Sequence, residues 1–320
     1  MSMEERPGAD PQGPPIAARG LVKRYRNLAA VDRIDLTVRP GDIYGFLGPN
    51  GAGKTTTLRM LMSLVRPDAG SIRLFGRELA RDPIAALQGV AGFIEEPRLY
   101  PYLSGRANLE LLAAFDRNRD PTATIDEVLD LVELRDRAGD RVSEYSQGMR
   151  QRLGIASCLV RRPKLLLLDE PANGVDPAGL RFLRELLRRL ADDGITILLS
   201  SHLLSEVEQV CTRVAMISRG RIVYEGAIGE LREVARRPYR LEPTDLEAAV
   251  TAMGAEPAVS DVRVEDGALL FTAADDSALV AVTSALASAG VGVRALTRAS
   301  DSLEHLFFEL TERAPAEVAT

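Results

Sequence analysis

A glycine-rich segment at residues 48–56, GPNGAGKTT, has the composition of a phosphate-binding loop. In the spacing G-x-x-x-x-G-K-T, backbone N–H groups surround phosphates, and glycines let the chain approach them closely. Lys54 would neutralise the β- and γ-phosphates, and Thr55 would hold Mg²⁺. A glycine-rich turn with an exposed lysine is disfavoured, because lysine occurs only three times in the chain. The residues expected to bind nucleotide here are Gly48, Pro49, Asn50, Gly51, Ala52, Gly53, Lys54, Thr55 and Thr56.

Two adjacent carboxylates, Asp169 and Glu170, follow the apolar run Leu165–Leu168. Carboxylates at the carboxyl end of a buried strand lie where ligands bind in parallel sheets. Asp169 would reach Mg²⁺ directly or through water, and Glu170 would orient and deprotonate an attacking water. An ordinary strand end that enters an acidic loop is the alternative, and the phosphate-binding loop upstream argues against it.

His202 follows an apolar strand at residues 195–201. It could stabilise charge on a γ-phosphate, or it could be a partly buried histidine with a structural role. The only other histidine, His305, has no chemical neighbours and is expected to be structural. Ser146 has the side chain of a helix N-cap, and Gly148 permits close backbone approach.

Several elements must position these residues. Short apolar strands alternate with helices, which predicts a mostly parallel sheet covered on both sides. A helical insertion is expected at about 97–150, because residues 107–115 and 125–134 have helical spacing. The other expected strands are 17–25, 31–38, 42–47, 71–75, 164–169, 194–200, 214–218 and 222–224, and the expected helices are 54–64, 153–160 and 180–190.

A second unit is expected from residue 237 to residue 320. Its predicted strand–helix–strand–strand–helix–strand order is that of a small α+β domain of the ferredoxin-like type. A final amphipathic helix is predicted from the spacing of apolar side chains. Residues 1–15 are expected to be a disordered tail, which leaves 16–236 as the first domain. The apolar residues of the final helix are Leu303, Leu306, Phe307 and Leu310.

The composition excludes several classes of protein. The chain has 320 residues and a formal net charge of −6, which argues against nucleic acid as its main partner. No apolar run approaches the ~18–20 residues of a membrane helix. Only Cys158 and Cys211 are present, so a disulfide framework is not expected. We expect a cytoplasmic protein that serves a membrane only through a partner chain.

The motifs and their order resemble the ATP-binding subunit of an ABC transporter over about residues 16–235. Segment 48–56 is similar to the Walker A loop, and 165–170 to the Walker B strand. His202 resembles the switch histidine, and Tyr25 resembles the aromatic residue that stacks on adenine; a tyrosine that packs on the sheet is the alternative for Tyr25. The remaining matches are Ser146, Gln147, Gly148 and Met149 with the signature, and Asn173, Gly174, Val175 and Asp176 with the D-loop.

This resemblance implies a P-loop NTPase fold, which consists of a RecA-like, mostly parallel sheet, a β-strand subdomain and a helical insertion. It implies ATP and Mg²⁺ as ligands and a head-to-tail dimer of two copies. Ser146 and Gly148 would then act on the ATP of the other copy, and Gln147 and Asp176 are also expected to bind nucleotide. A separate transmembrane permease would dock on the helical insertion and hold the chain at the inner face of the membrane.

Two departures from the family pattern bear on function. The signature has Gln147 where glycine is usual, and Glu95 stands where the family has a glutamine near Mg²⁺ and the attacking water. We therefore expect Glu95 to contact the metal and to affect catalysis. A glutamate at position 95 resembles the variant found in the bacitracin and lantibiotic self-protection exporters. The C-terminal unit resembles the C-terminal extension of drug-resistance ATPases of the daunorubicin type.

The resemblance implies a subunit that hydrolyses ATP to power a bacterial exporter of drugs, antibiotics or lantibiotics. The alternative from another class is a soluble ABC-type ATPase that acts on ribosomes or DNA. An importer subunit is a further alternative, against which Glu95 and the C-terminal unit weigh. A Rossmann-type dinucleotide binder is excluded, because the loop is not G-x-G-x-x-G.

Overall fold

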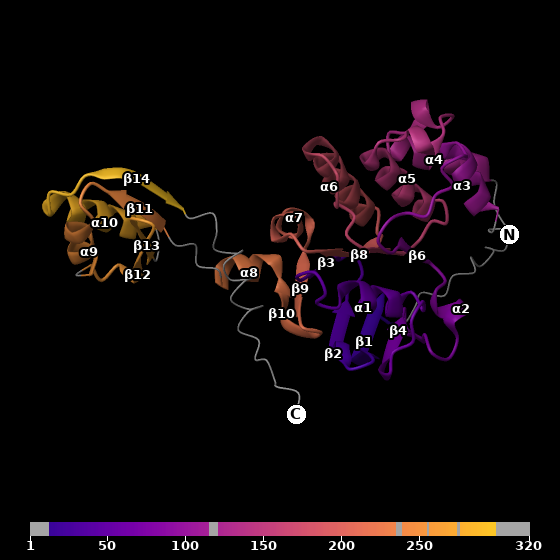
Figure 1. Cartoon of the computed structure of the whole chain (residues 1–320), viewed down its shortest axis with the longest axis horizontal. Helices are drawn as coiled ribbons and strands as arrows, with labels where there is room; N and C mark the ends of the chain where they lie inside the picture. The colour runs from indigo at the N-terminus through magenta and orange to yellow at the C-terminus, as the bar shows by residue number, and fades with distance from the viewer. Residues whose placement is uncertain (1–12, 115–120, 235–238, 255, 274–275, 299–320) are drawn as a thin grey trace, which may run out of the picture. The chain divides into compact units, whose positions relative to one another are not determined.

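The computed structural model describes residues 13–114, 121–234, 239–254, 256–273 and 276–298. The chain divides into two compact units, with the boundary between Ile228 and Gly229 (Figure 1). Each unit has its own hydrophobic core. Most of the expected N-terminal tail, His305 and the expected final helix lie outside the described residues.

A six-stranded sheet forms the centre of the first unit, in the order β10-β9-β3-β8-β7-β6. All neighbouring pairs are parallel except β10 with β9. Every residue of β3, β7 and β8 is buried, as their continuous apolar runs predict. The strands are β3 (Ile43–Leu47), β6 (Val90–Phe93), β7 (Leu165–Leu168), β8 (Thr196–Ser201), β9 (Arg213–Ser218) and β10 (Arg221–Ala227).

The parallel pairing of the strands determines where the segments that follow them lie. Because β3, β7 and β8 run in the same direction, their carboxyl ends meet at one edge of the sheet. The loop that follows Leu47, the carboxylates that follow Leu168 and the histidine that follows Ser201 therefore emerge together. The predicted mostly parallel sheet is confirmed, and it positions three segments that are far apart in the sequence.

A second, antiparallel sheet has the order β2-β1-β4-β5. Its strands are β1 (Ile16–Tyr25), β2 (Leu28–Val38), β4 (Ala69–Leu74) and β5 (Arg77–Glu78). Helix α1 (Lys54–Leu61) shares one core with both sheets, in which Leu36 and Leu58 join Phe46 and Leu167. The predicted β-strand subdomain is thereby confirmed.

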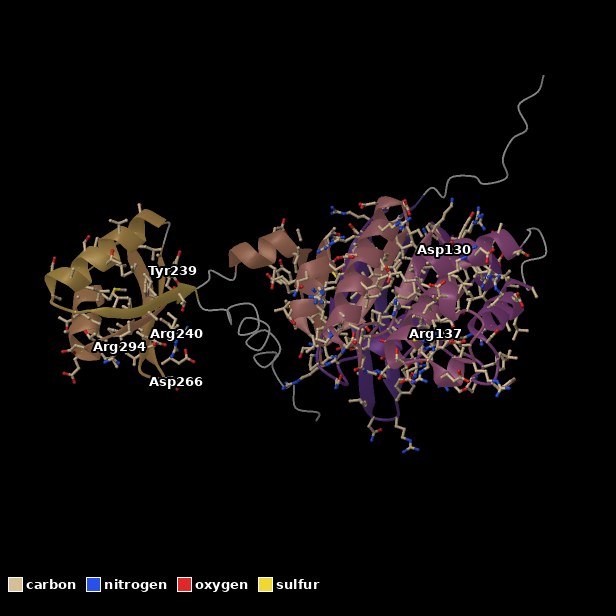
Figure 2. All side chains as sticks on the ribbon, turned by 90° about the horizontal axis from the view of Figure 1, so that it is seen from above. Asp130, Arg137, Tyr239, Arg240, Asp266 and Arg294 are labelled. Carbon is tan, nitrogen blue, oxygen red and sulfur yellow. The ribbon has the colours of Figure 1, made fainter. Side chains whose placement is uncertain are left out.

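The helical insertion contains α3 (Gly105–Ala113), α4 (Pro121–Leu131) and α5 (Gln147–Leu159). Ile125, Val128 and Leu129 are buried, as the helical spacing of apolar residues over 125–134 predicts. The surface carries ion pairs, which include Arg135 with Asp130 and Arg137 with Asp140 (Figure 2). Two short 3₁₀ turns, Arg135–Arg137 and Val142–Glu144, connect α4 to α5.

The first unit also contains α2 (Pro83–Ala86), α6 (Pro177–Asp192) and α7 (Leu204–Val210), and α8 (Ile228–Val234) begins at the boundary between the two units. Leu183, Leu187 and Leu190 of α6 are buried, as their spacing predicts. The helix begins at Pro177, earlier than expected, because the Asp176 side chain caps it.

The second unit has the element order β11-α9-β12-β13-α10-β14 and an antiparallel sheet ordered β12-β13-β11-β14. Leu241, Met253 and Val282 belong to its core, where the Tyr239 ring stacks on Phe271 with the centroids 5.6 Å apart. The predicted β-α-β-β-α-β order is confirmed. The bounds are β11 (Tyr239–Pro243), α9 (Leu246–Gly254), β12 (Val259–Glu265), β13 (Ala268–Ala273), α10 (Asp276–Ser288) and β14 (Val293–Arg298).

Candidate functional site

The segment after β3 folds into a cradle for anions. Lys54 is the first residue of α1, and its amine donates to the carbonyls of Gly48 (2.6 Å) and Pro49 (3.3 Å). Only 5% of Lys54 is exposed. The backbone N–H groups of the first helical turn have no carbonyl four residues earlier to bond. They add the partial positive charge of a helix N-terminus to that of the lysine.

Glycine is required at two points of this cradle. A Cβ on Gly48 would lie 2.4 Å from the carbonyl oxygen of Ile217. A Cβ on Gly53 would lie 2.3 Å from that of Ala30, and Gly53 has a φ of +111°. By contrast, a Cβ on Gly51 meets no atom within 4 Å. The loop is therefore packed tightly against β9 of the six-stranded sheet and β2 of the antiparallel sheet, and it is open at Gly51.

Asp169 lies at the end of β7 and is 1% exposed. Its Oδ1 accepts a hydrogen bond of 2.5 Å from the Ser200 hydroxyl. Within the described residues, its Oδ2 is buried without a hydrogen-bond partner. An unpartnered buried carboxylate oxygen is costly, so this atom fits a metal ion or a metal-bound water.

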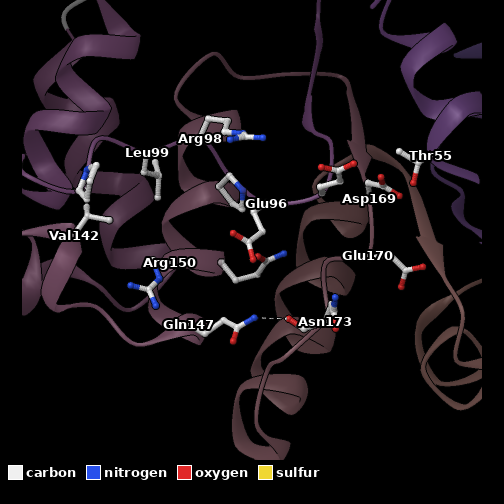
Figure 3. A pocket seen from close by; sticks show the side chains of 14 residues that line it. Thr55, Glu96, Arg98, Leu99, Val142, Gln147, Arg150, Asp169, Glu170 and Asn173 are labelled. Atoms are coloured by element: carbon white, nitrogen blue, oxygen red, sulfur yellow. Dashed lines mark hydrogen bonds between the residues drawn. The ribbon is translucent and has the colours of Figure 1, made fainter. Parts of the chain in front are cut away.

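Thr55 and Asp169 line one cavity of about 700 Å³, together with Glu170, Glu95 and residues of the helical insertion (Figure 3). In the described part of the chain, no three His, Cys, Asp or Glu side chains gather into a metal site of their own. Mg²⁺ commonly takes one or two protein ligands and completes its shell with phosphates and water. Thr55 and Asp169 therefore fit Mg²⁺ bound together with a nucleotide.

Glu170 is held between two basic side chains. Its Oε1 lies 3.1 Å from the Lys54 amine, and its Oε2 lies 2.8 Å from His202 Nδ1. The backbone N–H of Glu170 donates to the Ser200 hydroxyl, and its φ of +48° is rare for a non-glycine residue. This strained backbone turns the carboxylate toward the cavity, where it can accept a proton from water.

Glu95 lies on the wall of the same cavity. Its Oε1 accepts a hydrogen bond of 2.7 Å from the guanidinium of Arg59 on α1. The Glu95 side chain is 57% exposed. The structure thus brings Glu95 to the cavity that Asp169 lines, with Arg59 as its ion-pair partner.

The expected signature and D-loop residues begin helices. Ser146 caps α5 by accepting from the Met149 N–H, and Asp176 caps α6 by accepting from the Gly179 N–H. A Cβ on Gly148 would meet no atom within 4 Å. No hydrogen bond between described residues joins these three to segment 48–56. The backbone around Gly148 is open to a second molecule.

Tyr25 ends β1 and is 44% exposed. The Lys23 amine lies 5.6 Å from the centroid of its ring. The ring therefore does not pack in the core of the sheets, and its exposed face is free to stack on a planar ligand.

Besides Arg59, the sequence patterns did not predict two residues that bond or lie near the two carboxylates. Ser200 is fully buried and bonds both Asp169 and Glu170; its signal was a polar residue at the end of an apolar strand. Glu206 of α7 accepts from the Ser201 hydroxyl at 3.2 Å. Burial, reinforced by the charge of Glu170, raises the pKa of Glu206.

Known proteins share this sequence and fold. The model of the ABC transporter family matches residues 31–173. The bacitracin transport ATP-binding protein BcrA of Bacillus licheniformis is 36% identical over 92% of this chain and 96% of its own length. The daunorubicin/doxorubicin resistance ATP-binding protein DrrA of Streptomyces peucetius is 35% identical over 92% of each chain.

A solved structure of an ATP-binding subunit of an ABC transporter has a TM-score of 0.62 and 27% identity, and the match covers 68% of this chain and 92% of that one. The phosphate cradle, the paired carboxylates and the histidine lie at the carboxyl edge of the matched fold. With relatives aligned along nine tenths of its length, the chain belongs to the ATP-binding proteins of ABC transporters, a family that couples ATP hydrolysis to transport.

Proposed function

We propose that this chain hydrolyses Mg²⁺-bound ATP to power the export of an antibiotic or another drug through a separate permease. The observation that carries the chemistry is the Glu170 carboxylate, which lies between Lys54 and His202 and lines the same cavity as Asp169, whose Oδ2 has no hydrogen-bond partner among the described residues. The named functions of BcrA and DrrA, bacitracin transport and daunorubicin resistance, support the choice of cargo class.

The contacts of Lys54 suggest how nucleotide binding would prepare the site. Its amine bonds two loop carbonyls and the Glu170 carboxylate. The phosphates of ATP would compete with Glu170 for this amine, since all are anionic acceptors. Glu170 would then keep its contact with His202 and have Oε1 free to accept a proton from the attacking water. Bound Mg²⁺ would supply charge neutralisation at the phosphate oxygens.

We further propose that two copies close head to tail around ATP, and that Ser146, Gly148 and Asp176 act on the nucleotide of the other copy. The open backbone at Gly148 supports this arrangement. A permease is needed to carry cargo, and none of the helices in the described ranges is long and apolar enough to cross a membrane. The chain would then work at the inner face of the membrane.

The role of Glu170 as general base is tested with the variant Glu170→Gln. We expect it to bind ATP and form an ATP-dependent dimer, while single-turnover hydrolysis falls by about 10²–10⁴-fold, the usual contribution of a general base. Fluorescent-nucleotide binding and phosphate release measure the two effects. Hydrolysis at the wild-type rate would show that another group accepts the proton.

The transport role is tested by purifying the tagged chain from gently solubilised native membranes and identifying what accompanies it. We expect a stoichiometric polytopic membrane protein. Recovery with ribosomes or DNA-processing proteins in the soluble fraction would leave the ATP chemistry intact and replace export by the soluble alternative.

A further inference from the structure

We propose that Gln147 is a positioning residue that links the signature segment to the loop after Glu170 within one chain. Through this link, engagement of the signature with a second copy would be transmitted to the chain's own hydrolytic carboxylate. The inference rests on the proposed function, because it requires two copies that share ATP.

The link consists of two consecutive hydrogen bonds. The Gln147 side-chain amide donates to the carbonyl oxygen of Asn173 at 3.2 Å (Figure 3). The N–H of Asn173 in turn donates to the carbonyl oxygen of Glu170 at 3.1 Å. Ser146, directly before Gln147, begins α5 as its cap. These two hydrogen bonds thus connect the start of α5 to the backbone of Glu170, the proposed general base.

Gly174 leaves the space that the Gln147 side-chain amide occupies. Its φ is +69°, and a Cβ placed on it would lie 2.2 Å from the Gln147 amide nitrogen and 2.6 Å from the amide carbon. The glutamine amide therefore occupies space that any other residue at position 174 would fill. This steric fit is independent of the hydrogen bond and points to the same pair of segments.

The location of the pair explains why it would matter to catalysis. Gln147 and Asn173 line the cavity that also holds Thr55, Asp169 and Glu170. Both side chains are exposed, so a second copy that closes over Gly148 would cover them. Movement of the signature on closure would then displace Asn173 and, through it, Glu170. A glycine at position 147, which is usual in the family, has no side chain and would not make the hydrogen bond to Asn173.

The hydrogen bond is tested with Gln147→Met, which keeps the length and neutrality of the side chain but has no N–H donor. ATP-dependent dimerisation is measured in the Glu170→Gln background, and the Hill coefficient of hydrolysis in the wild-type background. We expect the dimer dissociation constant to rise about two- to tenfold, the range of one exposed hydrogen bond, and the Hill coefficient to fall toward one.

The steric contact is tested with a double-mutant cycle between Gly174→Ala and Gln147→Ala. Gly174→Ala brings both backbone strain and the clash with the amide, whereas in the Gln147→Ala background only the strain remains. We expect the substitution at 174 to reduce dimerisation and cooperativity less in that background. Gly194→Ala is the matched control, because Gly194 has a φ of +88° and open space around it.

The outcomes separate the two proposals. If the parent Glu170→Gln chain dimerises with ATP but Gln147→Met retains the parental dissociation constant and Hill coefficient, the link is overturned and the proposed function stands. Additive effects at positions 147 and 174 would overturn it equally. If the parent forms no ATP-dependent dimer, the shared-ATP mechanism fails, and the link fails with it.

Discussion

The buried hydroxyl of Ser200 positions both carboxylate residues at the carboxyl edge of the parallel sheet. It donates to Asp169 and accepts from the backbone of Glu170, so it fixes both carboxylate residues at once. The spacing of the sequence predicted Lys54, Asp169 and Glu170, because their motifs are local. It could not predict Ser200 or Arg59, since each acquires its partner only when another strand or helix packs beside it.

Substitution of Ser200 by alanine should therefore affect both stability and metal binding. We expect Ser200→Ala to lower the free energy of unfolding by about 1–3 kcal/mol, because it leaves a buried carboxylate oxygen without its donor. The misplaced Asp169 should also weaken Mg²⁺-dependent ATP binding. Urea unfolding and nucleotide titration with and without Mg²⁺ measure these effects. Wild-type values in both would show that Ser200 does not hold Asp169.

Glu95→Gln should alter turnover while ATP binding is retained. The substitution removes a negative charge from the cavity wall near Asp169 and Glu170 and breaks the ion pair with Arg59. We expect the Mg²⁺ concentration needed for half-maximal hydrolysis to rise a few-fold, because charge attracts the cation. A magnesium titration of ATPase activity with the permease present measures the change. An unchanged ATPase would contradict the expected role.

At the scale of elements, short segments complete the site. The continuous apolar strands and amphipathic helices were predictable from their pattern, but β6 and α7 were not. β6 has four residues, as β7 does, but its apolar run is interrupted by Gly92, where a Cβ would lie 2.0 Å from the Leu167 carbonyl oxygen. α7 has seven residues and no side-chain cap. Both depend on tertiary contacts rather than on local preference.

Glu206 of α7 should make stability depend on pH. Burial raises the pKa of Glu206 above the ordinary value of 4.5, so folding favours the protonated form. The cost of burying the carboxylate is full above the folded pKa and disappears as the pH falls through 4.5. We expect Glu206→Gln to be more stable than wild type at pH 8, with a difference that shrinks toward pH 4.5. Urea unfolding of both proteins across this range measures it, and a constant difference would contradict the burial.

At the scale of the whole molecule, the two units divide the work. Every site residue discussed above precedes residue 207 and lies in the first unit. The second unit has its own core, which includes Leu241 and Phe271. The order of its elements was predictable from periodicity and turns. Its role was not, because none of its residue spacings indicates a chemistry.

The sequence predicts a domain boundary at residues 236–237, whereas the two compact units divide after Ile228. We propose that a chain that ends at 236 folds and binds ATP with the affinity of the full chain. The phosphate cradle and its supporting strands are all retained. Calorimetry of the full chain should show two unfolding transitions, of which the shortened chain keeps one. Loss of ATP binding on truncation would show that the second unit supports the first.

The exposure of Tyr25 has an optical consequence. The chain contains no tryptophan, so its intrinsic emission comes from tyrosines alone. An indole introduced as Tyr25→Trp would be the sole one in the molecule and would stand at the open end of β1. We expect the ring at this position to stack on adenine, as the family resemblance predicts; stacking would quench the emission, and release of the nucleotide would restore it. Arrival and departure of the nucleotide would thus become visible in real time, without a dye.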